Sequence, residues 1–314
     1  MGLRTSVILF VIVSTAKLQA QDAIAYYNRS QEQMLTGNYQ EALSTIDKAL
    51  LVDSSKAAYF LQKATLYYHL QEYKDALRLC YSANRIEPDN PKVHYLRGLL
   101  SMATDNSGGA VFFFGKVIAQ SPDQDYVYNS YIGRGKTNLR NGKTGAAKSD
   151  FRLALQLKPD SIEPQFLLAT AFLQTKEADS ALMVIEKVLQ TAPEKPQSYK
   201  LLGNIYHTQK NYSQAETAYN KYCSMVINDA EVLQDLSALC LENKDYDKAR
   251  TYIERAITLF PSEPLNFKIL AMIFLESGRN EEGCNNMFKA FQLGYLEKYG
   301  YDALDVYQGK CEGK

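Results

Sequence analysis

Apolar residues recur at three- and four-residue steps along most of the chain, and the stretch Pro196–Asp229 shows this pattern most clearly. The apolar face of a first predicted helix holds Tyr199, Leu202, Gly203 and Tyr206. After a polar break at 208–211, a second predicted helix has its apolar face at Tyr212, Ala215, Tyr219 and Tyr222. One such helix pair cannot bury both of its faces, so it requires neighbours of the same kind.

Two columns of small residues show that this unit repeats eight times. The first column lies in the second helix, at Ala42, Ala76, Ala110, Ala147, Ala181, Ala215, Ala249 and Gly283. Every step is 34 residues except the one from Ala110 to Ala147, which is 37. Twelve positions earlier stand Ser30, Ala64, Gly98, Gly135, Ala169, Gly203, Ser237 and Ala271. We expect the two helices of each unit to cross where these small residues meet.

The prolines support the same frame. One column just after the second helix contains Pro88, Pro122, Pro159, Pro193 and Pro261. Pro91, Pro196 and Pro264 stand at the first residue of a unit, where a helix tolerates proline because that N–H has no partner. None of the nine prolines lies in the interior of a predicted helix.

The frame predicts an all-α chain and divides it into eight repeats, numbered 1 to 8 below. They span 23–56, 57–90, 91–124, 128–161, 162–195, 196–229, 230–263 and 264–297. Repeat 3 is irregular, because Asp105–Gly109 replaces the usual turn and three phenylalanines, Phe112–Phe114, follow it. Three extra residues, Asp125–Val127 in this frame, precede repeat 4.

These repeats resemble the tetratricopeptide repeat (TPR). That family has a 34-residue helix–turn–helix with an aromatic early in its first helix, then Leu-Gly, an aromatic, Ala, an aromatic, Ala and Pro. Repeat 4 carries Tyr131, Gly135, Ala147, Phe151, Ala154 and Pro159 in this order. The resemblance implies one continuous right-handed superhelical solenoid over 21–297, without an internal domain boundary.

The last residues, 298–314, are expected to cap this array. Tyr301–Gln308 can form a short helix over the exposed face of repeat 8, as solenoids require for solubility. Cys284 on repeat 8 and Cys311 near the end could form a disulfide that pins this helix; the alternative is two free thiols. Cys80 and Cys240 fall in apolar columns and are interpreted as core residues, and Cys223 could approach Cys240.

The amino terminus has the layout of a secretory signal peptide. Arg4 precedes a short apolar run, Val7–Val13, and Leu18–Ala20 is an acceptable processing site. We expect cleavage after Ala20, so that 1–20 is removed and the protein is exported to the periplasm, the cell envelope or the medium. An uncleaved anchor is the alternative.

Composition and motifs exclude several functions. The 35 basic and 35 acidic residues give a net charge of zero, which disfavours nucleic acid as a partner. The three histidines, His69, His94 and His207, share no ligand spacing with Cys, Asp or Glu, so no metal is expected. No phosphate loop and no nucleophile–base arrangement is visible. We therefore expect no enzyme, no cofactor and no small-molecule substrate.

The resemblance places a ligand on the concave face lined by the first helix of each repeat, at positions 2, 5, 6, 9, 12 and 13. The residues carried over are Tyr27, Gln31, Tyr68, His69, Tyr95, Leu99, Met102, Lys136, Arg140, Phe166, Thr170, Lys200, Asn204 and His207. Aromatic and polar groups mixed in this way suit a peptide or protein partner. Some of them could instead pack against adjacent repeats.

Some TPR domains hold a partner's terminal carboxylate between Lys, Asn and Arg side chains. Lys200 and Asn204 match the first element, but Asp235 stands where the next Asn is needed, so we reject this mode. A second candidate surface is Phe112 and Phe113. They are either covered by Tyr126 and Tyr128 or form a patch for a partner or a second copy. The sequence thus predicts a non-catalytic binding scaffold or assembly factor that most resembles the exported TPR proteins of the bacterial cell envelope. A structural homo-oligomer built through repeat 3 is the alternative.

Overall fold

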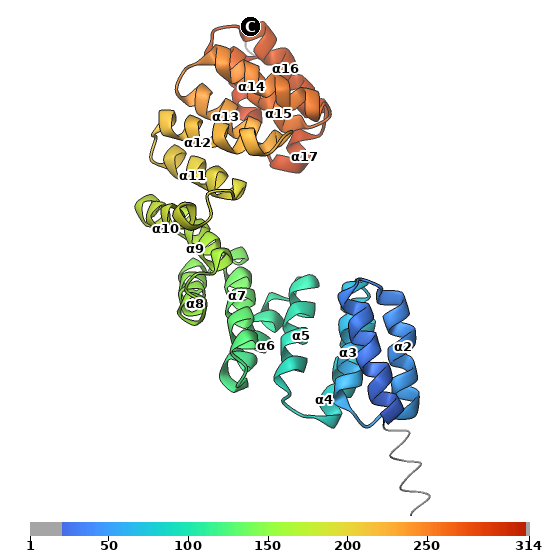
Figure 1. Cartoon of the computed structure of the whole chain (residues 1–314). Coiled ribbons are helices and arrows are strands. Elements are labelled where there is room, and N and C mark those ends of the chain that lie inside the picture. The colour runs from blue at the N-terminus through green and yellow to red at the C-terminus, as the bar shows by residue number, and fades with distance from the viewer. Residues whose placement is uncertain (1–20, 312–314) are drawn as a thin grey trace, which may run out of the picture. The chain divides into compact units, whose positions relative to one another are not determined.

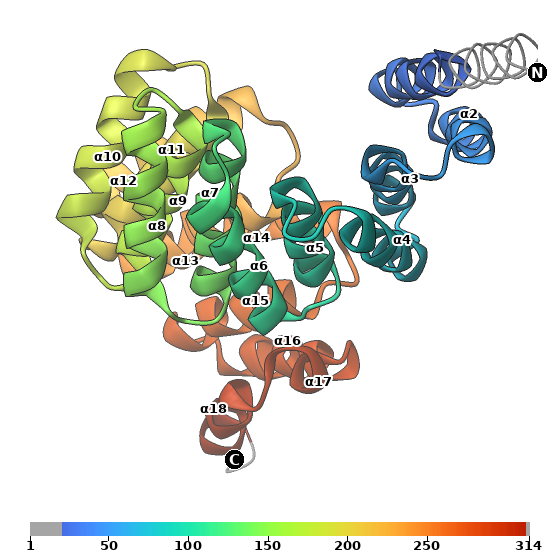
Figure 2. The same cartoon turned by 90° about the horizontal axis from the view of Figure 1, so that it is seen from below.

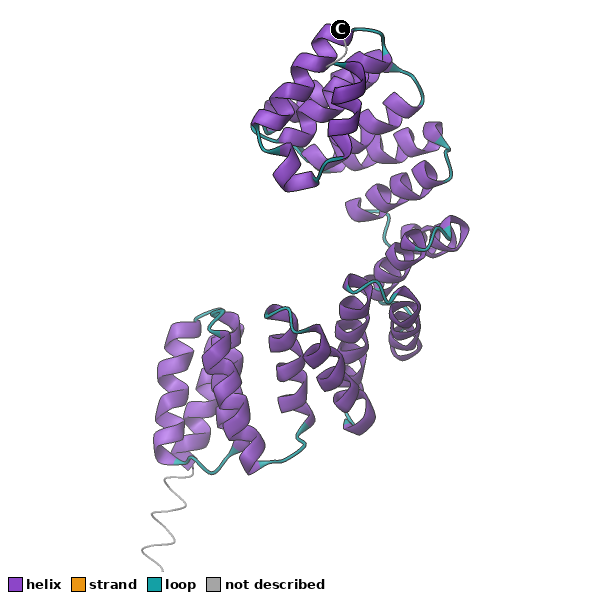
Figure 3. Cartoon of the chain, turned by 180° about the vertical axis from the view of Figure 1, so that it is seen from behind, coloured by secondary structure: helices purple, strands orange, loops and turns teal. Residues whose placement is uncertain are grey.

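The computed structural model describes residues 21–311, which form helices joined by short loops, with no strand among them (Figure 3). The described residues divide between Leu167 and Leu168 into two compact units, called the N-terminal and C-terminal units below. The all-α class of the prediction is confirmed. Continuity of one array across the two units, and the division into eight repeats, stay predictions.

In the N-terminal unit, residues 21–35 are helical and precede seven further helices (Figure 1). These are α2 (Tyr39–Val52), α3 (Ala57–His69), α4 (Tyr73–Ile86), α5 (Pro91–Ala103), α6 (Ser107–Gln120), α7 (Gln124–Arg140) and α8 (Thr144–Leu157). Helix α9 (Ile162–Gln174) begins in this unit and ends in the next. Consecutive helices pack in pairs, α3 with α4, α5 with α6 and α7 with α8, so each pair forms one helix–turn–helix.

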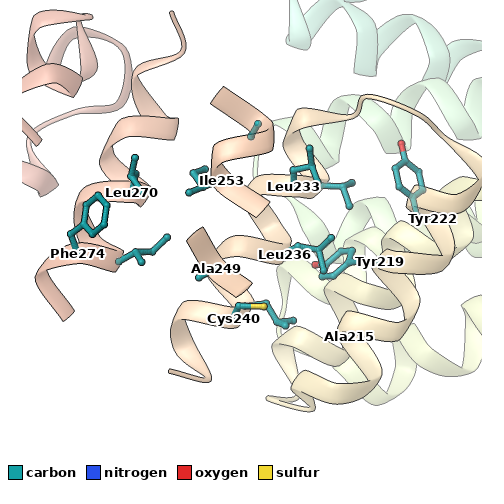
Figure 4. Packing of buried hydrophobic residues seen from close by; sticks show 14 residues of the cluster. Ala215, Tyr219, Tyr222, Leu233, Leu236, Cys240, Ala249, Ile253, Leu270 and Phe274 are labelled. Carbon is teal, nitrogen blue, oxygen red and sulfur yellow. The ribbon is translucent and has the colours of Figure 1, made fainter. Parts of the chain in front are cut away.

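The C-terminal unit continues with the same kind of pair. Its helices are α10 (Ala178–Thr191), α11 (Pro196–Thr208), α12 (Tyr212–Met225), α13 (Ala230–Glu242), α14 (Tyr246–Leu259), α15 (Pro264–Glu276), α16 (Asn280–Gln292), α17 (Tyr295–Tyr299) and α18 (Asp302–Lys310). Figure 4 shows one of its cores, where Ala249 and Ile253 of α14 lie between Leu236 of α13 and Phe274 of α15.

The turn inside each pair has one residue in the left-handed backbone region. It is always the fifteenth residue of the repeat: Gly37, Gln71, Asp105, Gly142, Lys176, Lys210, Lys244 and Gly278. Five of these eight carry a side chain there, although only glycine adopts this conformation without cost. The geometry of the turn is therefore kept even where its residue type is unfavourable.

The two small columns meet as expected. The Ser30 hydroxyl donates to the carbonyl of Ala42 at 2.9 Å, and the Ser237 hydroxyl donates to that of Ala249 at 2.8 Å. These bonds join residues twelve apart in different helices, so the backbones approach closely where the small residues lie.

The irregular repeat 3 is accommodated by a longer helix after it. Helix α7 has 17 residues, against 13 in α5, because the extra residues extend it at its amino end. Phe114 is fully buried, but 57% of Phe112 is exposed. Of the two tyrosines that could cover it, Tyr126 packs on Tyr95 and the hydroxyl of Tyr128 bonds Ser161.

The C-terminal helices α17 and α18 pack on the last pair, α15 and α16. Tyr295 and Ala303 are buried there with Met287. Cys284 and Cys311 form a disulfide that joins α16 to the residue after α18. The other three cysteines are free, so Cys223 and Cys240 are not joined.

The signal-peptide prediction falls on 1–20, outside the described residues. Within 21–311, no helix has the length and apolarity needed to cross a membrane.

Candidate binding groove in the N-terminal unit

A cavity with a volume of about 490 Å³ lies along the first helices of repeats 1 to 3 in the N-terminal unit. It is lined by Tyr27, Gln31, Met34, Ala58, Leu61, Gln62, Thr65, Glu87, Asn90, Pro91, Lys92, Ser121, Pro122, Asp123 and Tyr126. The lining comes from 21–35, α3, two loops and the starts of α5 and α7. We call this cavity the groove. Figure 2 shows α3, α5 and α7, three of the elements that contribute to it.

Two helix caps fix the wall of the groove that is formed by the starts of α5 and α7. The Asn90 side chain accepts from the backbone N–H of Lys92 at 2.9 Å, and Pro91 occupies the first position of α5. Asp123 accepts from the backbone N–H of Asp125 at 2.9 Å and so starts α7. These caps place Lys92 and Tyr126 together, with the Lys92 Nζ 6.0 Å from the centre of the Tyr126 ring. Among the described residues Lys92 forms no ion pair, so its charge remains available.

Tyrosine side chains supply most of the aromatic surface. The Tyr126 ring meets Tyr95 edge to face, with centroids 5.2 Å apart. Burial raises the pKa of Tyr27, Tyr95 and Tyr126, and the nearby Tyr68 raises that of Tyr95 further. These phenols therefore stay neutral at physiological pH and can donate hydrogen bonds to a ligand.

Carboxamides supply the polar groups on the opposite wall. The Gln31 amide donates to the Tyr27 hydroxyl at 2.9 Å, which orients both. Gln62 is only 6% exposed, and its amide nitrogen reaches no better acceptor than the Met34 sulfur at 3.6 Å. A thioether is a weak acceptor, so this buried donor lacks a partner of ordinary strength. An amide carbonyl entering the groove would supply one.

The residues expected on the concave face lie in different surroundings. Tyr27 and Gln31 line the groove, Tyr95 contacts its wall, and Tyr68 is close to Tyr95. His69 stacks on Tyr39 with centroids 5.0 Å apart. The remaining predicted residues that are half-buried or packed on a hydrophobic core are Leu99, Met102, Phe166 and Thr170.

The predicted basic and amide residues are occupied by neighbouring repeats. Lys136 pairs with Glu163 at 2.5 Å and Arg140 with Asp105 at 2.9 Å. In the C-terminal unit, Lys200 pairs with Glu231 at 2.7 Å, and His207 lies 3.2 Å from Glu242. Asn204 accepts a hydrogen bond from Tyr219 at 2.5 Å. The four basic side chains thus join successive repeats, whereas the bond between Asn204 and Tyr219 lies within repeat 6.

Sequence reasoning missed several groove residues that obey its own positional rule. Lys92, Gln62, Thr65 and Met34 occupy positions 2, 6, 9 and 12 of their repeats. Tyr126 had no such signal, because it belongs to the three extra residues before repeat 4. It was considered only as a cover for Phe112.

Residues 21–311 contain no group of three or more His, Cys, Asp or Glu side chains that could hold a metal ion. His94 is buried at 2% exposure, and its ring stacks on Phe113. The groove therefore presents neutral phenols, carboxamides, one ammonium group and the carboxylates of Glu87 and Asp123, which can hold a polypeptide segment by hydrogen bonds and ring contacts.

Comparison with protein families identifies the repeats. Two models described as "Tetratricopeptide repeat" match the chain, one over 27–91 and the other over 128–161 and 230–263. The chain carries tetratricopeptide repeats. A third model, described as "Anaphase-promoting complex, cyclosome, subunit 3", matches 151–222. The matched stretches of the TPR models begin and end within a few residues of the predicted frame.

Curated relatives share the TPR region at low identity. "RANBP2-like and GRIP domain-containing protein 8" of Homo sapiens is 27% identical over 130 residues, which is 40% of this chain and 7% of that protein. "Protein O-mannosyl-transferase TMTC3" of Homo sapiens is 24% identical over 244 residues, which is 76% of this chain and 26% of that protein. The chain thus spans about a quarter or less of the length of these relatives.

Solved structures support the TPR solenoid fold. The Cut9–Hcn1 hetero-tetramer of the APC/C has a TM-score of 0.62 at 14% identity and covers 87% of this chain and 52% of that chain. MamA from Desulfovibrio magneticus RS-1 has a TM-score of 0.50 at 19% identity and covers 55% of this chain and 96% of that chain. At these identities the likeness concerns the fold alone.

Proposed function

We propose that this TPR protein is a non-catalytic scaffold or assembly factor that binds an extended segment of a partner protein in the groove. The observation that carries this proposal is Gln62, a buried carboxamide whose amide nitrogen has only a thioether as acceptor. A backbone carbonyl of a bound segment would complete its hydrogen bonding, while Tyr27 and Tyr126 contact side chains of the segment.

Lys92 adds a preference for segments with an acidic residue. It lines the groove beside Tyr126 and forms no ion pair with the described residues. A carboxylate at that point would pair with the Lys92 ammonium group, which the Tyr126 ring helps to hold in place. Neither a nucleic acid nor a small-molecule substrate is part of the proposal.

Export is the second part of the proposal. The layout of Arg4, the apolar run 7–13 and Ala20 supports passage to the periplasm, cell envelope or medium. The transferase activity in the name of one relative is that protein's own, and this chain spans 26% of it. We therefore propose binding without catalysis.

The test compares wild-type protein with a groove variant, Lys92→Glu with Tyr126→Ala, both starting at Gln21. Partners are captured from an envelope extract, and the affinity of the purified partner is then measured by calorimetry. We expect the groove variant to bind at least tenfold more weakly. A charge-matched control, Lys74→Glu, changes an exposed lysine outside the groove and should bind as the wild type does.

A partner that binds the groove variant as tightly as the wild type would overturn the proposal. The alternative, a structural homo-oligomer assembled through repeat 3, is favoured by the exposed ring of Phe112. Sedimentation at increasing concentration distinguishes the two, because only a homo-oligomer gains mass without any partner.

A further inference from the structure

On α5, the guanidinium of Arg97 lies between two aromatic rings. Its central carbon is 4.0 Å from the centre of the Phe113 ring and 4.8 Å from that of Tyr81. The Nε atom is buried and has no hydrogen-bond partner. Among the described residues no carboxylate pairs with Arg97. Figure 2 shows α5 between α4 and α6, the helices that carry the two rings.

The same position of the neighbouring repeats is paired with an acid. Lys63 of repeat 2 bonds Asp47 of the preceding repeat at 2.6 Å. Arg134 of repeat 4 bonds the buried Asp150 of its own repeat, with its closest contact at 2.6 Å and a second nitrogen at 3.1 Å.

The two repeat positions that hold Asp47 and Asp150 in the neighbouring repeats hold aromatic residues next to Arg97. Tyr81 stands 34 residues after Asp47, and Phe113 stands 37 residues before Asp150, which are the repeat spacings at those points. Each carboxylate that neutralises the cation in a neighbouring repeat is thus replaced by a ring that flanks it. An aromatic ring attracts a guanidinium but does not remove its charge. Arg97 therefore keeps a full positive charge on a weakly hydrated group.

Other charged groups nearby are already paired. The Lys116 ammonium, 5.8 Å from the centre of the Phe112 ring, bonds Asp89 at 2.9 Å. Asp89 also lies 3.3 Å from the buried His94. The unneutralised charge of this region is therefore that of Arg97.

Exposed apolar side chains adjoin the two rings, because Phe112 packs on Phe113 and Leu77 stands one helical turn before Tyr81 on α4. Leu77 is 36% exposed, Tyr81 51% and Phe112 57%. We call the set of Leu77, Tyr81, Arg97, Phe112 and Phe113 the arginine patch. The patch is distinct from the groove, because Arg97 and Tyr95 are two positions apart on α5 and so point about 200° apart around the helix axis.

We propose that the arginine patch binds a Glu or Asp side chain of a partner protein, in a segment whose neighbouring residues are apolar. The rings cover the two faces of the guanidinium, so a carboxylate approaches its N–H edge, where a bidentate pair can form. Apolar neighbours of that carboxylate cover Phe112 and Tyr81. Charge complementarity selects this occupant, since a purely apolar segment would bury an unpaired cation.

The test uses a capped tripeptide, Ac-Phe-Glu-Phe-NH2, and its neutral match, Ac-Phe-Gln-Phe-NH2. The Nε–H resonance of Arg97 in an NMR spectrum reports binding and is assigned by its loss in Arg97→Lys. We expect the glutamate peptide to shift this resonance in a saturable way, and the glutamine peptide to bind at least tenfold more weakly.

Two substitutions at one site separate charge from packing. Tyr81→Asp restores the acid that Lys63 has in Asp47, so Arg97 becomes paired within the chain and peptide affinity falls at least tenfold. Tyr81→Asn introduces a side chain of the same size as Asp but without its charge. Its affinity for the glutamate peptide should stay within about threefold of that of a Tyr81→Leu variant. Lys63→Gln, which removes the paired cation one repeat earlier, should bind as the wild type does. Thermal unfolding checks that every variant is folded.

Equal binding of the two peptides, or full binding by Tyr81→Asp, would overturn the proposal. So would a concentration-dependent dimer that Phe112→Ser dissolves and the glutamate peptide leaves intact, because the patch would then bind a second copy of the chain. The groove variant Lys92→Glu with Tyr126→Ala should bind the peptide normally. Failure of the patch and failure of the groove are therefore distinguishable.

Discussion

A Cβ atom placed on Gly203 would lie 2.5 Å from the ring of Tyr219. The same relationship joins Gly98 to Phe114 and Gly135 to Phe151, at 2.7 and 2.5 Å. Repeats whose second helix has Ile at this position carry Ala or Ser in place of Gly, as with Ala169 and Ile185 in repeat 5. The two positions therefore share a nearly fixed volume, and glycine is required where the partner is aromatic.

Gly203→Ala should lower the free energy of unfolding by about 1–3 kcal/mol, because the methyl group overlaps the Tyr219 ring. Adding Tyr219→Ile should restore part of this loss by copying repeat 5, although it removes the bond to Asn204. Urea unfolding of the two single variants and the double variant measures the coupling. Strictly additive effects would contradict the shared-volume interpretation.

The left-handed turn residue predicts opposite effects for two substitutions. Lys176→Gly should stabilise the protein by about 0.5 kcal/mol, since relief of backbone strain exceeds the added entropy of the unfolded chain. Gly142→Ala should destabilise it by about 1 kcal/mol, and by strain alone, because nothing lies within 4 Å of the added Cβ. Thermal unfolding of both variants checks these signs. If Gly142→Ala were neutral, the turn would tolerate strain without cost.

The disulfide between Cys284 and Cys311 should stabilise the C-terminal cap. It closes a loop with a sequence separation of 27, so its loss in Cys284→Ser with Cys311→Ser should cost roughly 3 kcal/mol. Hydrogen exchange should accelerate in α18 far more than in α11. Cys223→Ser, which removes a free thiol, serves as the control. Uniform acceleration over both helices would argue against a local role.

The contribution of Asp235 to stability should fall as the pH rises from about 4 to about 6. Burial raises the pKa of Asp235 to about 6, and the nearby Lys200 only partly opposes this. Because the folded state holds the proton more tightly than the unfolded state, ionisation of Asp235 costs at most about 3 kcal/mol and is complete above its folded-state pKa.

Asp235→Asn should remove this loss. The difference in free energy of unfolding between the variant and the wild type should therefore favour the variant more at pH 7 than at pH 4. Urea unfolding at both values measures it, and the exposed Asp247→Asn provides the charge-matched control. An advantage that is the same at both pH values would mean that the carboxyl of Asp235 titrates normally.

The repeat frame could be predicted from the sequence because it depends on local, periodic constraints. The column containing Gly203 and Ala169 is set by close packing inside each helix pair, and Pro196 and Pro264 mark helix starts. Phe114, whose ring lies against Gly98, is buried for the same reason.

The binding surface was harder to predict, because availability depends on partners far along the chain. Lys200 fits the positional rule for a ligand contact, yet its ammonium group pairs with Glu231, 31 residues later. Lys92 fits the same rule and has no such partner. Tyr126 reaches the groove only because the extra residues lengthen α7, and no repeat consensus describes an insertion.

Because the disulfide lies near one end of the chain, we expect the repeats at the two ends to differ in how readily they unfold. Linear repeat arrays lose their terminal units first, because each end repeat has a neighbour on one side only. Repeat 8 is fastened to its cap by a disulfide, whereas repeat 1 contains no cysteine. Fraying should therefore begin in the repeats that form the groove. A partner bound there would stabilise these repeats against local unfolding. When the partner dissociates, the groove repeats should become the first part of the chain that a protease can cut.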